Sequence, residues 1–332
     1  MLDRNNKLKI KAIYISLAVS ILILIIKVGA YFLTGSSAIF ADALESVVHI
    51  IATTMAVYSI ILSTKPPDET HLYGHGNIEY FSAGVEGLFI IIAAIAIIYT
   101  SIDHIISGTY IEQLDYGTFL IGAAGLINVV LGNYLVRKGK DTNSIALVAD
   151  GKHVLTDSFT SIGIVFGLIL VIFTDYKIID PIIALFVAFN IIYTGIKLLR
   201  ESVGGLMNET DEKILRQIIE TLNSKRKDYW IDLHQLRFWK SAERVFIDFH
   251  LTLPYYFTIR ESHSQDDNIA EIIKNEIPNS QVKIHFDYCN EALCKYCRYE
   301  KCKVRKEDFS KNIPWDETKL LGDAINKSTH IS

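Results

Sequence analysis

The sequence lacks the features that mark several large classes of protein. Its four cysteines all lie between Cys289 and Cys302, so no disulfide framework holds the whole chain together. A basic stripe is absent and the formal net charge is −4, which argues against a nucleic-acid-binding protein. No glycine-rich phosphate-binding motif occurs, which argues against ATP-driven pumping. What the chain does have is hydrophobic residues: they make up 50% of it and concentrate before about residue 206.

Six long apolar segments account for this hydrophobicity. A helix needs about 20 predominantly apolar residues to cross a bilayer, and the segments that qualify are about 8–34, 38–62, 79–106, 116–136, 144–174 and 179–199. Basic residues flank one side of the series: Arg4, Lys7, Lys9, Lys11, Lys65, Arg137, Lys138, Lys140, Lys197 and Arg200. The opposite side has only Lys177. The positive-inside rule therefore predicts that residues 1–205 form an all-α six-helix transmembrane bundle in the cell membrane, with both termini in the cytoplasm.

Two of these segments carry related polar sequences. Residues 37–49 read SAIFADALESVVH, and residues 144–157 read SIALVADGKHVLTD. Aligning their Ala-Asp pairs gives each segment two potential metal ligands four residues apart, and that spacing puts both side chains on one helix face. Two such helices packed face to face would gather two imidazoles and two carboxylates, a plausible tetrahedral shell for a divalent metal such as zinc. We call this set the helix site; it consists of Glu45, His49, His153 and Asp157.

The alternative interpretation is that these are polar residues tolerated in the core helices of a soluble protein. An ionisable residue at the centre of a membrane helix costs roughly 2.5–3.5 kcal/mol on insertion scales. Four of them at matching positions favour a functional site. Asp42 and Asp150 each lie three residues before a proposed ligand, where either could support the ligands or relay protons.

The loop after the second apolar segment is also rich in potential ligands. Residues 65–77 read KPPDETHLYGHGN, in which two prolines end the helix and two glycines keep the chain turning. Asp68, His71 and His75, which we call the loop site, offer two imidazoles and a carboxylate at short spacing. Such a set suits a metal site of modest affinity; solvated loop histidines are the alternative.

Residues 206–288 have the patterns of a small soluble domain. Helices are predicted over 211–223 and near 260–276, and strands near 230–237, 244–253 and 281–287. The order α-β-β-α-β is typical of an open-faced α+β sandwich. The strand faces opposite the apolar residues carry His234, His250, His285 and Asp287, and His263 lies near the start of the second helix.

The A-x-x-A-D sequences with paired ligands, the PPDETHLYGHG loop, and six helices followed by a soluble domain resemble the cation diffusion facilitator family of metal–proton antiporters. The resemblance covers about residues 8–288. It implies that the helix site is the transport site, that the loop site is an accessory site, and that the soluble domain is metallochaperone-like and dimerises. It also implies a cytoplasmic binuclear zinc site, here called the sheet site, formed by His234, His250, His263, His285 and Asp287.

Two departures from the family pattern stand out. The pair in the second segment is Glu45 and His49, where well-known zinc members have His or Asp followed by Asp. Asn77 stands where many members have Lys. Because the composition of a ligand shell helps to tune selectivity, the first departure leaves the transported metal open.

The chain after the soluble domain lies outside the family pattern. Residues 289–302 read CNEALCKYCRYEKC, and a reducing cytoplasm would leave these thiols free. Cys289, Cys294, Cys297 and Cys302 are spaced closely enough for one tetrahedral thiolate site; four unrelated surface thiols are the alternative. Residues 303–332 are charged and polar, and we expect a mostly disordered tail.

These observations predict a secondary transporter and not an enzyme. The expected activity is export of a divalent transition metal, with zinc as the first candidate, in exchange for protons, by a homodimer in the lipid bilayer without nucleotide or nucleic acid. The alternative function is a membrane-anchored metal sensor without transport activity. A membrane metalloenzyme is disfavoured because a four-ligand shell leaves no open coordination position.

Overall fold

The computed structural model describes residues 2–108, 111–141 and 145–325, and the chain folds into two compact units. The first unit comprises the described residues up to Ile60 together with Tyr80–Val203. The second comprises Ile61–Glu79 and the described residues from Gly204 onward. The loop between the second and third apolar segments therefore belongs to the second unit. Ser144, the first residue of the second polar sequence, lies outside the described residues.

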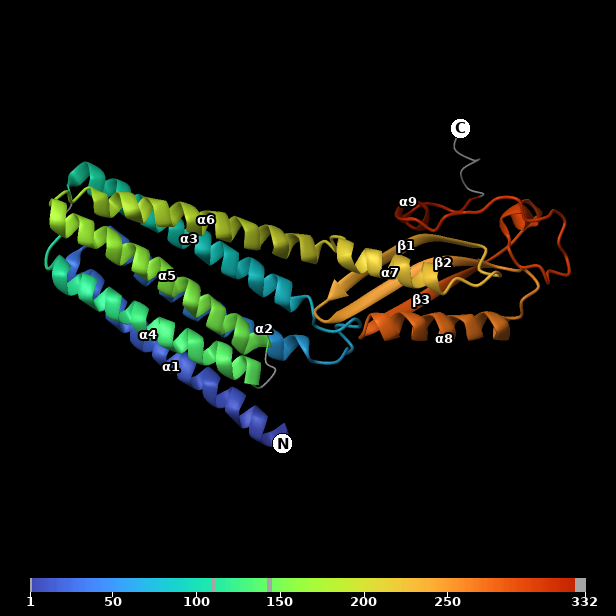
Figure 1. Ribbon diagram of the computed structural model, residues 1–332, viewed down its shortest axis with the longest axis horizontal. Helices are drawn as coiled ribbons and strands as arrows, with labels where there is room; N and C mark the ends of the chain where they lie inside the picture. Colours follow the sequence, from blue (N-terminus) through green and yellow to red (C-terminus); the bar gives the residue numbers. More distant parts are fainter. Residues whose placement is uncertain (1, 109–110, 142–144, 326–332) are drawn as a thin grey trace. The chain divides into compact units, whose positions relative to one another are not determined.

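The first unit contains six long helices that run alongside one another (Figure 1). They are α1 (Leu2–Thr34), α2 (Ser37–Ser63), α3 (Ile78–Ser107), α4 (Leu114–Asp141), α5 (Ile145–Thr174) and α6 (Ile179–Leu206). Each contains a stretch long and apolar enough to cross a membrane. The prediction of six membrane helices is confirmed. Several helices, α4 and α6 among them, continue past the predicted apolar ends because polar residues extend the same helix into water.

Small residues allow some of these helices to pack closely. α4 packs against α1 and α5. A Cβ atom at Gly132 of α4 would lie 2.9 Å from the carbonyl oxygen of Gly151 on α5, and one at Gly151 would lie 2.7 Å from the backbone nitrogen of Val136. Glycine at both positions therefore brings the backbones of α4 and α5 together, as small residues do in membrane helix pairs.

A buried ion pair joins α1 and α2. The Nζ atom of Lys27 lies 2.9 Å from Oδ1 of Asp42, and each side chain is only 1% exposed. Lys27 also donates to the hydroxyl of Ser46, and the Ser161 hydroxyl of α5 donates to Asp42 at 2.9 Å. Because a charge in a membrane core needs a partner, this network fixes how α1, α2 and α5 meet.

The second unit contains a three-stranded sheet with helices packed on one face. Its elements are α7 (Glu212–Ser224), β1 (Asp232–Ser241), β2 (Arg244–Leu253), α8 (Ile259–Glu276) and β3 (Ser280–Tyr288). β1 pairs antiparallel with β2, and β2 pairs parallel with β3. Apolar residues of α7 and α8, such as Ile218 and Ile273, share one core with the inward residues of the strands, such as Phe249. The predicted α-β-β-α-β order and open-faced arrangement are confirmed (Figure 1).

The chain after β3 differs from the expectation of a disordered tail. A 3₁₀ helix, η1 (Glu291–Tyr296), follows the sheet. A short helix, α9 (Glu317–Leu321), comes later in the chain and packs against β1. Ile313, Trp315 and Leu320 are buried in the same core as α7 and the strands. The segment is polar on average, but these few apolar residues pack it against the domain up to residue 325. Residues 326–332 of the predicted tail lie outside the described part.

Candidate metal centres

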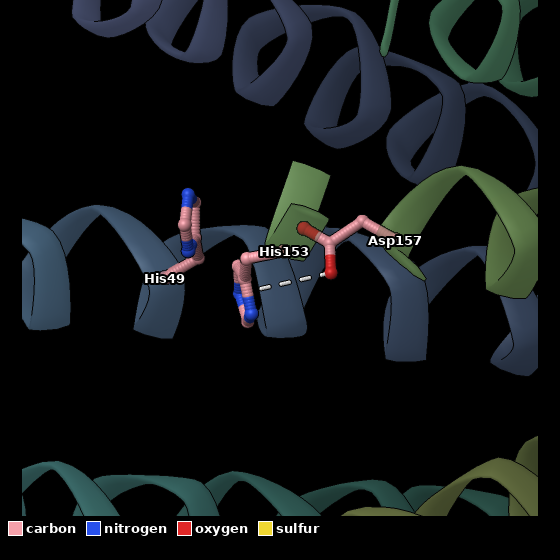
Figure 2. Close-up of side chains that lie close together, drawn as sticks. All are labelled: His49, His153 and Asp157. Carbon is pink, nitrogen blue, oxygen red and sulfur yellow. Dashed lines mark ion pairs between the residues drawn. The ribbon is translucent and has the colours of Figure 1, made fainter. Parts of the chain in front are cut away.

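The helix site brings together ligands from α2 and α5. One ligand atom from each of His49, His153 and Asp157 lies within 4.8 Å of the other two. Nε2 of His153 is 3.8 Å from Oδ1 of Asp157, one turn further along α5. The rings of His49 and His153 stack with centroids 4.3 Å apart, so the two imidazoles face each other between the helices (Figure 2). Two nitrogen donors and one carboxylate at this spacing can bind a transition-metal ion.

Glu45 is the fourth predicted ligand of the helix site. It lies one turn before His49 on α2, and its carboxylate is not part of the group within 4.8 Å. It interacts electrostatically with His153 and Asp157. A rotation about its side-chain bonds is therefore needed before all four residues could bind one ion.

A small cavity adjoins His49 of the helix site. Its volume is about 260 Å³, and Ser16, Ser20, His49, Thr53 and Asp150 line it together with apolar residues of α1 and α2. The Ser16 hydroxyl donates to Oδ2 of Asp150 at 2.9 Å. The lining is mostly apolar, but it places the side chains of Ser16, Thr53 and Asp150 in the same cavity as His49.

The loop site is closed by hydrogen bonds within the loop. Asp68 lies 3.4 Å from Nδ1 of His71 and 3.3 Å from Nε2 of His75. Hydrogen bonds to Asp68 from the Thr70 side chain, and from the backbone N–H groups of His71 and Thr70, hold the pKa of this carboxyl at about 2. The carboxylate is therefore ionised and ready to bind a cation. Nδ1 of His75 is buried without a hydrogen-bond partner.

The loop that carries this site is anchored to the sheet. The Tyr73 ring packs edge-on against Trp239 of β1 and Phe246 of β2, at centroid distances of 5.8 and 5.5 Å. Gly76 lies so close to Ser241 that an added Cβ would be 2.7 Å from its carbonyl oxygen. The hairpin of β1 and β2 thus fixes the loop on both sides of His75.

The sheet site follows from strand register. His234 pairs with His250 across β1 and β2, and His250 pairs with His285 across β2 and β3, so the three histidines form a row across the sheet. Oδ2 of Asp287 lies 3.3 Å from Nε2 of His234 and 3.0 Å from Nδ1 of His250. His234, His250 and Asp287 form the group with ligand atoms within 4.8 Å of one another.

The other two predicted ligands of the sheet site are further out. The ring of His285 is 4.5 Å from that of His250, centroid to centroid, and its Nε2 is 3.7 Å from Oδ1 of Asp287. His263 is 71% exposed on α8 and faces Asp267 of its own helix. His285 therefore lies next to the sheet-site group and could act as a further ligand, whereas His263 lies apart from it.

Asp232 and Lys319 support the sheet site but were not predicted from the sequence. Oδ2 of Asp232 is 3.4 Å from Nδ1 of His234, and Oδ1 is 2.7 Å from Nζ of Lys319. Burial alone would raise the pKa of Asp232, but His234, Lys319 and the backbone N–H of Ile325 lower it below its usual value. An ionised carboxylate behind a histidine ligand fixes the ring orientation and makes the nitrogen a better donor. The i, i+2 spacing to His234 was the available signal for Asp232; Lys319 had none.

Known protein families match most of the chain. The family described as the cation efflux transmembrane domain matches residues 13–207, and the one described as the cation efflux protein cytoplasmic domain matches residues 210–289. The second match ends at Cys289, so it includes only the first residue of the cysteine segment and none of the residues that follow it.

Three relatives illustrate the similarity. An uncharacterized transporter of Synechocystis is 36% identical over 262 residues, 79% of this chain and 84% of the relative. The cation-efflux pump FieF of Yersinia pestis is 28% identical over 282 residues, 82% of this chain and 90% of the relative. The magnetosome protein MamB of Magnetospirillum gryphiswaldense is 27% identical over 252 residues, 75% and 83% of the two chains.

The two family matches fall on the two parts of the fold that carry the candidate sites. Six apolar helices and the matched transmembrane domain make this a multi-pass membrane protein with a cytoplasmic domain. The efflux families and relatives indicate the export of divalent metal cations. The chain belongs to the cation diffusion facilitator family.

Proposed function

We propose that this protein exports Zn²⁺ from the cytoplasm in exchange for protons, working as a homodimer. The observation that carries the proposal is the helix site: His49, His153 and Asp157 come from two membrane helices and lie within 4.8 Å of one another. Ionisable residues inside a membrane bundle are costly and usually mark a transport path. The cavity beside His49 supports access to this site.

The ligand chemistry supports proton exchange. Histidine and carboxylate ligands must lose their protons before they bind a metal, so loading of the metal releases protons and the return of protons releases the metal. His49, His153 and Asp157 are the groups that would exchange protons for the metal, because they are its ligands. If the bundle alternates between two conformations, the same site can bind metal on one side and protons on the other.

The nitrogen donors favour zinc as the substrate. Imidazole suits zinc, and a shell of two imidazoles with carboxylates matches tetrahedral zinc sites. Glu45, which stands in place of a shorter Asp or a His, would complete the shell when its side chain turns toward His153. The same donors also accept cobalt, nickel, cadmium and ferrous iron, so the selectivity must be measured.

The loop site and the sheet site fit a supporting role in the cytoplasm. Both are made of carboxylates and imidazoles on the second unit, where cytoplasmic zinc would bind. Binding there would stabilise the dimer formed through the cytoplasmic domain and favour one conformation of the transporter by mass action.

The test is metal flux into proteoliposomes that contain the purified chain, with and without an imposed pH gradient. Zinc, cadmium, cobalt, nickel, ferrous iron and manganese are compared. We expect gradient-dependent flux, fastest for zinc. The double variant His49→Ala with Asp157→Ala should fall to the level of protein-free liposomes. The control is Thr156→Val, because Thr156 is exposed beside Asp157 and its hydroxyl donates to the Lys152 carbonyl of its own helix.

Each part of the proposal has its own contradiction. Flux that persists in the double variant would remove the helix site from the mechanism. A flux that is the same with and without the pH gradient would exclude proton exchange. A faster flux of another metal would exclude zinc as the preferred substrate. An absence of flux for every metal, with zinc binding to the second unit intact, would support the sensor function instead.

A further inference from the structure

The cysteine segment, residues 289–302, is folded against the edge of the second unit. The N–H of Cys289 donates to the carbonyl of Leu253 at 2.9 Å, which continues the pairing of β3 with β2. The chain then turns through η1, where the N–H of Cys297 donates to the carbonyl of Cys294 at 3.1 Å, and turns again at Cys302. These turns fold the segment back, so that Cys302 interacts electrostatically with Cys289, thirteen positions earlier in the sequence.

The four thiols share one half-buried region. Cys297 is 6% exposed and packs with Ile231 and Leu293, and Cys289 packs against the same cluster. Cys289 lies within electrostatic reach of Cys294 and Cys302, and Cys297 lies within reach of Cys289 and Cys302. All four thiols are free. Every cysteine of the chain is thus near at least one other.

The charged side chains around the four cysteines are mostly basic. The Arg305 guanidinium donates to the carbonyls of Cys297 and Tyr299 at 3.0 and 2.9 Å, which fixes the turn between the last two cysteines. Residues 289–306 contain six basic side chains and two acidic ones. A zinc ion bound by four thiolates carries a net charge of −2, so this excess of basic residues would balance it.

Without a metal, these sulfurs have no reason to come closer. Among the described residues no cysteine belongs to a group with three ligand atoms within 4.8 Å. An ion would displace the thiol protons and draw the sulfurs into its coordination sphere.

We propose that Cys289, Cys294, Cys297 and Cys302 bind one resident Zn²⁺ ion that fastens the segment after β3 to the sheet. Thiolates are softer ligands than the imidazole and carboxylate groups of the other three sites, and soft ligands favour zinc over the harder divalent ions. A zinc ion held by four thiolates would therefore stay bound. The ion would be structural and not the exported substrate. The proposal stands or falls independently of transport, since no helix-site residue takes part in it.

The test uses Co²⁺ as a spectroscopic substitute for zinc in the purified full-length protein, stripped of metal and kept reduced. Thiolate-bound Co²⁺ has a charge-transfer absorption in the near ultraviolet that imidazole and carboxylate ligands lack. We expect this band to saturate at one Co²⁺ per chain and to disappear when Zn²⁺ is added. Zn²⁺ should also slow the reaction of the thiols with a thiol reagent at least tenfold.

Two variants separate the thiolate site from the others. Cys294→Ser with Cys297→Ser should abolish the band, whereas His234→Ala with His250→Ala, which removes the centre of the sheet site, should leave it unchanged. The unaltered protein decides the matter even if a variant fails to fold. A missing charge-transfer band, with thiol reactivity equal in the presence and absence of Zn²⁺, would overturn the proposal. So would a protein purified without oxygen that contains iron and sulfide at these cysteines.

Discussion

Asp232 contacts two parts of the second unit that lie far apart in the sequence. It is 1% exposed, yet it carries a charge because His234 lies on one side and Lys319 on the other. It therefore links His234 on β1, a proposed metal ligand, to a residue on α9, far along the chain. A buried carboxylate with two such partners both stabilises the domain and fixes the orientation of the His234 ring.

We expect Asp232→Asn to lower the free energy of unfolding of the second unit at pH 7 by about 1.5–3 kcal/mol, the usual contribution of hydrogen bonds to a charged group. The pKa of Asp232 in the folded state lies below its ordinary value. Its stabilisation is therefore complete above that ordinary value, near pH 4, and is lost as the pH falls further. The difference between the variant and the parent should shrink below about pH 4.

Denaturant titrations in metal-free buffer measure this effect in the full-length protein. All three tryptophans, Trp230, Trp239 and Trp315, belong to the second unit, so their fluorescence reports on that unit alone. Asp267→Asn is the control, because Asp267 is 75% exposed and should change the stability little. A difference for Asp232→Asn that grows on acidification would contradict the argument.

Sequence reasoning at the residue scale succeeded where side-chain periodicity was enough. Alternation along a strand placed His234, His250 and His285 on one face, and the four-residue spacing brought His153 and Asp157 together. It could not supply register, which places the three histidines in one row and depends on an irregularity in β1 after His234. Nor could it supply side-chain rotation, which leaves Glu45 outside the helix-site group. The assignment of a metal to these residues stays a prediction.

At the scale of helices, the approach of α4 and α5 rests on two glycines. We expect Gly132→Ala to destabilise the bundle by about 1–3 kcal/mol, since the new methyl group would meet Leu155 and the Gly151 carbonyl and force the helices apart. The measurement is the thermal stability of the detergent-solubilised protein by size-exclusion chromatography after heating.

Gly163→Ala is the matched control on α5. A Cβ at Gly163 meets nothing within 4 Å, and alanine forms helices more readily than glycine by up to about 1 kcal/mol. This variant should be as stable as the parent or more so. Equal losses for both variants would show that helix packing at Gly132 does not limit stability.

Helix and strand positions were largely predictable from the sequence because long apolar stretches and strict alternation are strong signals. The ends of the elements were less so. α4 runs on to Asp141 and β1 to Ser241, past the predicted limits. Polar residues can continue a helix or a strand where tertiary contacts stabilise it, and such contacts leave no apolar pattern in the sequence. The buried pair of Lys27 and Asp42 was also hidden, since the two residues lie on different helices and each alone resembles an ordinary polar residue.

At the scale of the molecule, the second unit is larger than the matched cytoplasmic domain, which ends at residue 289. Trp315 is 2% exposed in the core, and the Arg226 guanidinium stacks on its ring at 4.0 Å. We expect Trp315→Ala to cost about 3–5 kcal/mol, as for other buried aromatic residues. The denaturation midpoint, followed by the fluorescence of Trp230 and Trp239, measures the loss.

Phe309→Ala is the control for this prediction. Phe309 is an aromatic residue of the same segment but is 43% exposed, so its removal should shift the midpoint much less. If both variants behave like the parent, the segment after residue 302 does not contribute to the core in solution. The sequence could not predict this packing, because Ile313, Trp315 and Leu320 follow neither a helical nor a strand period over a useful length.

The burial of Trp315 and Leu320 also sets an order of events during synthesis. The six membrane helices and the whole sheet leave the ribosome before these residues do, and domains fold as units once their parts are available. Until residue 320 has emerged, the core of the second unit lacks two of its buried side chains, and Asp232 lacks the Lys319 partner that neutralises it. The nascent protein can therefore be inserted in the membrane while the sheet site is still incomplete, because the Lys319 partner of Asp232 emerges after every membrane helix and every strand.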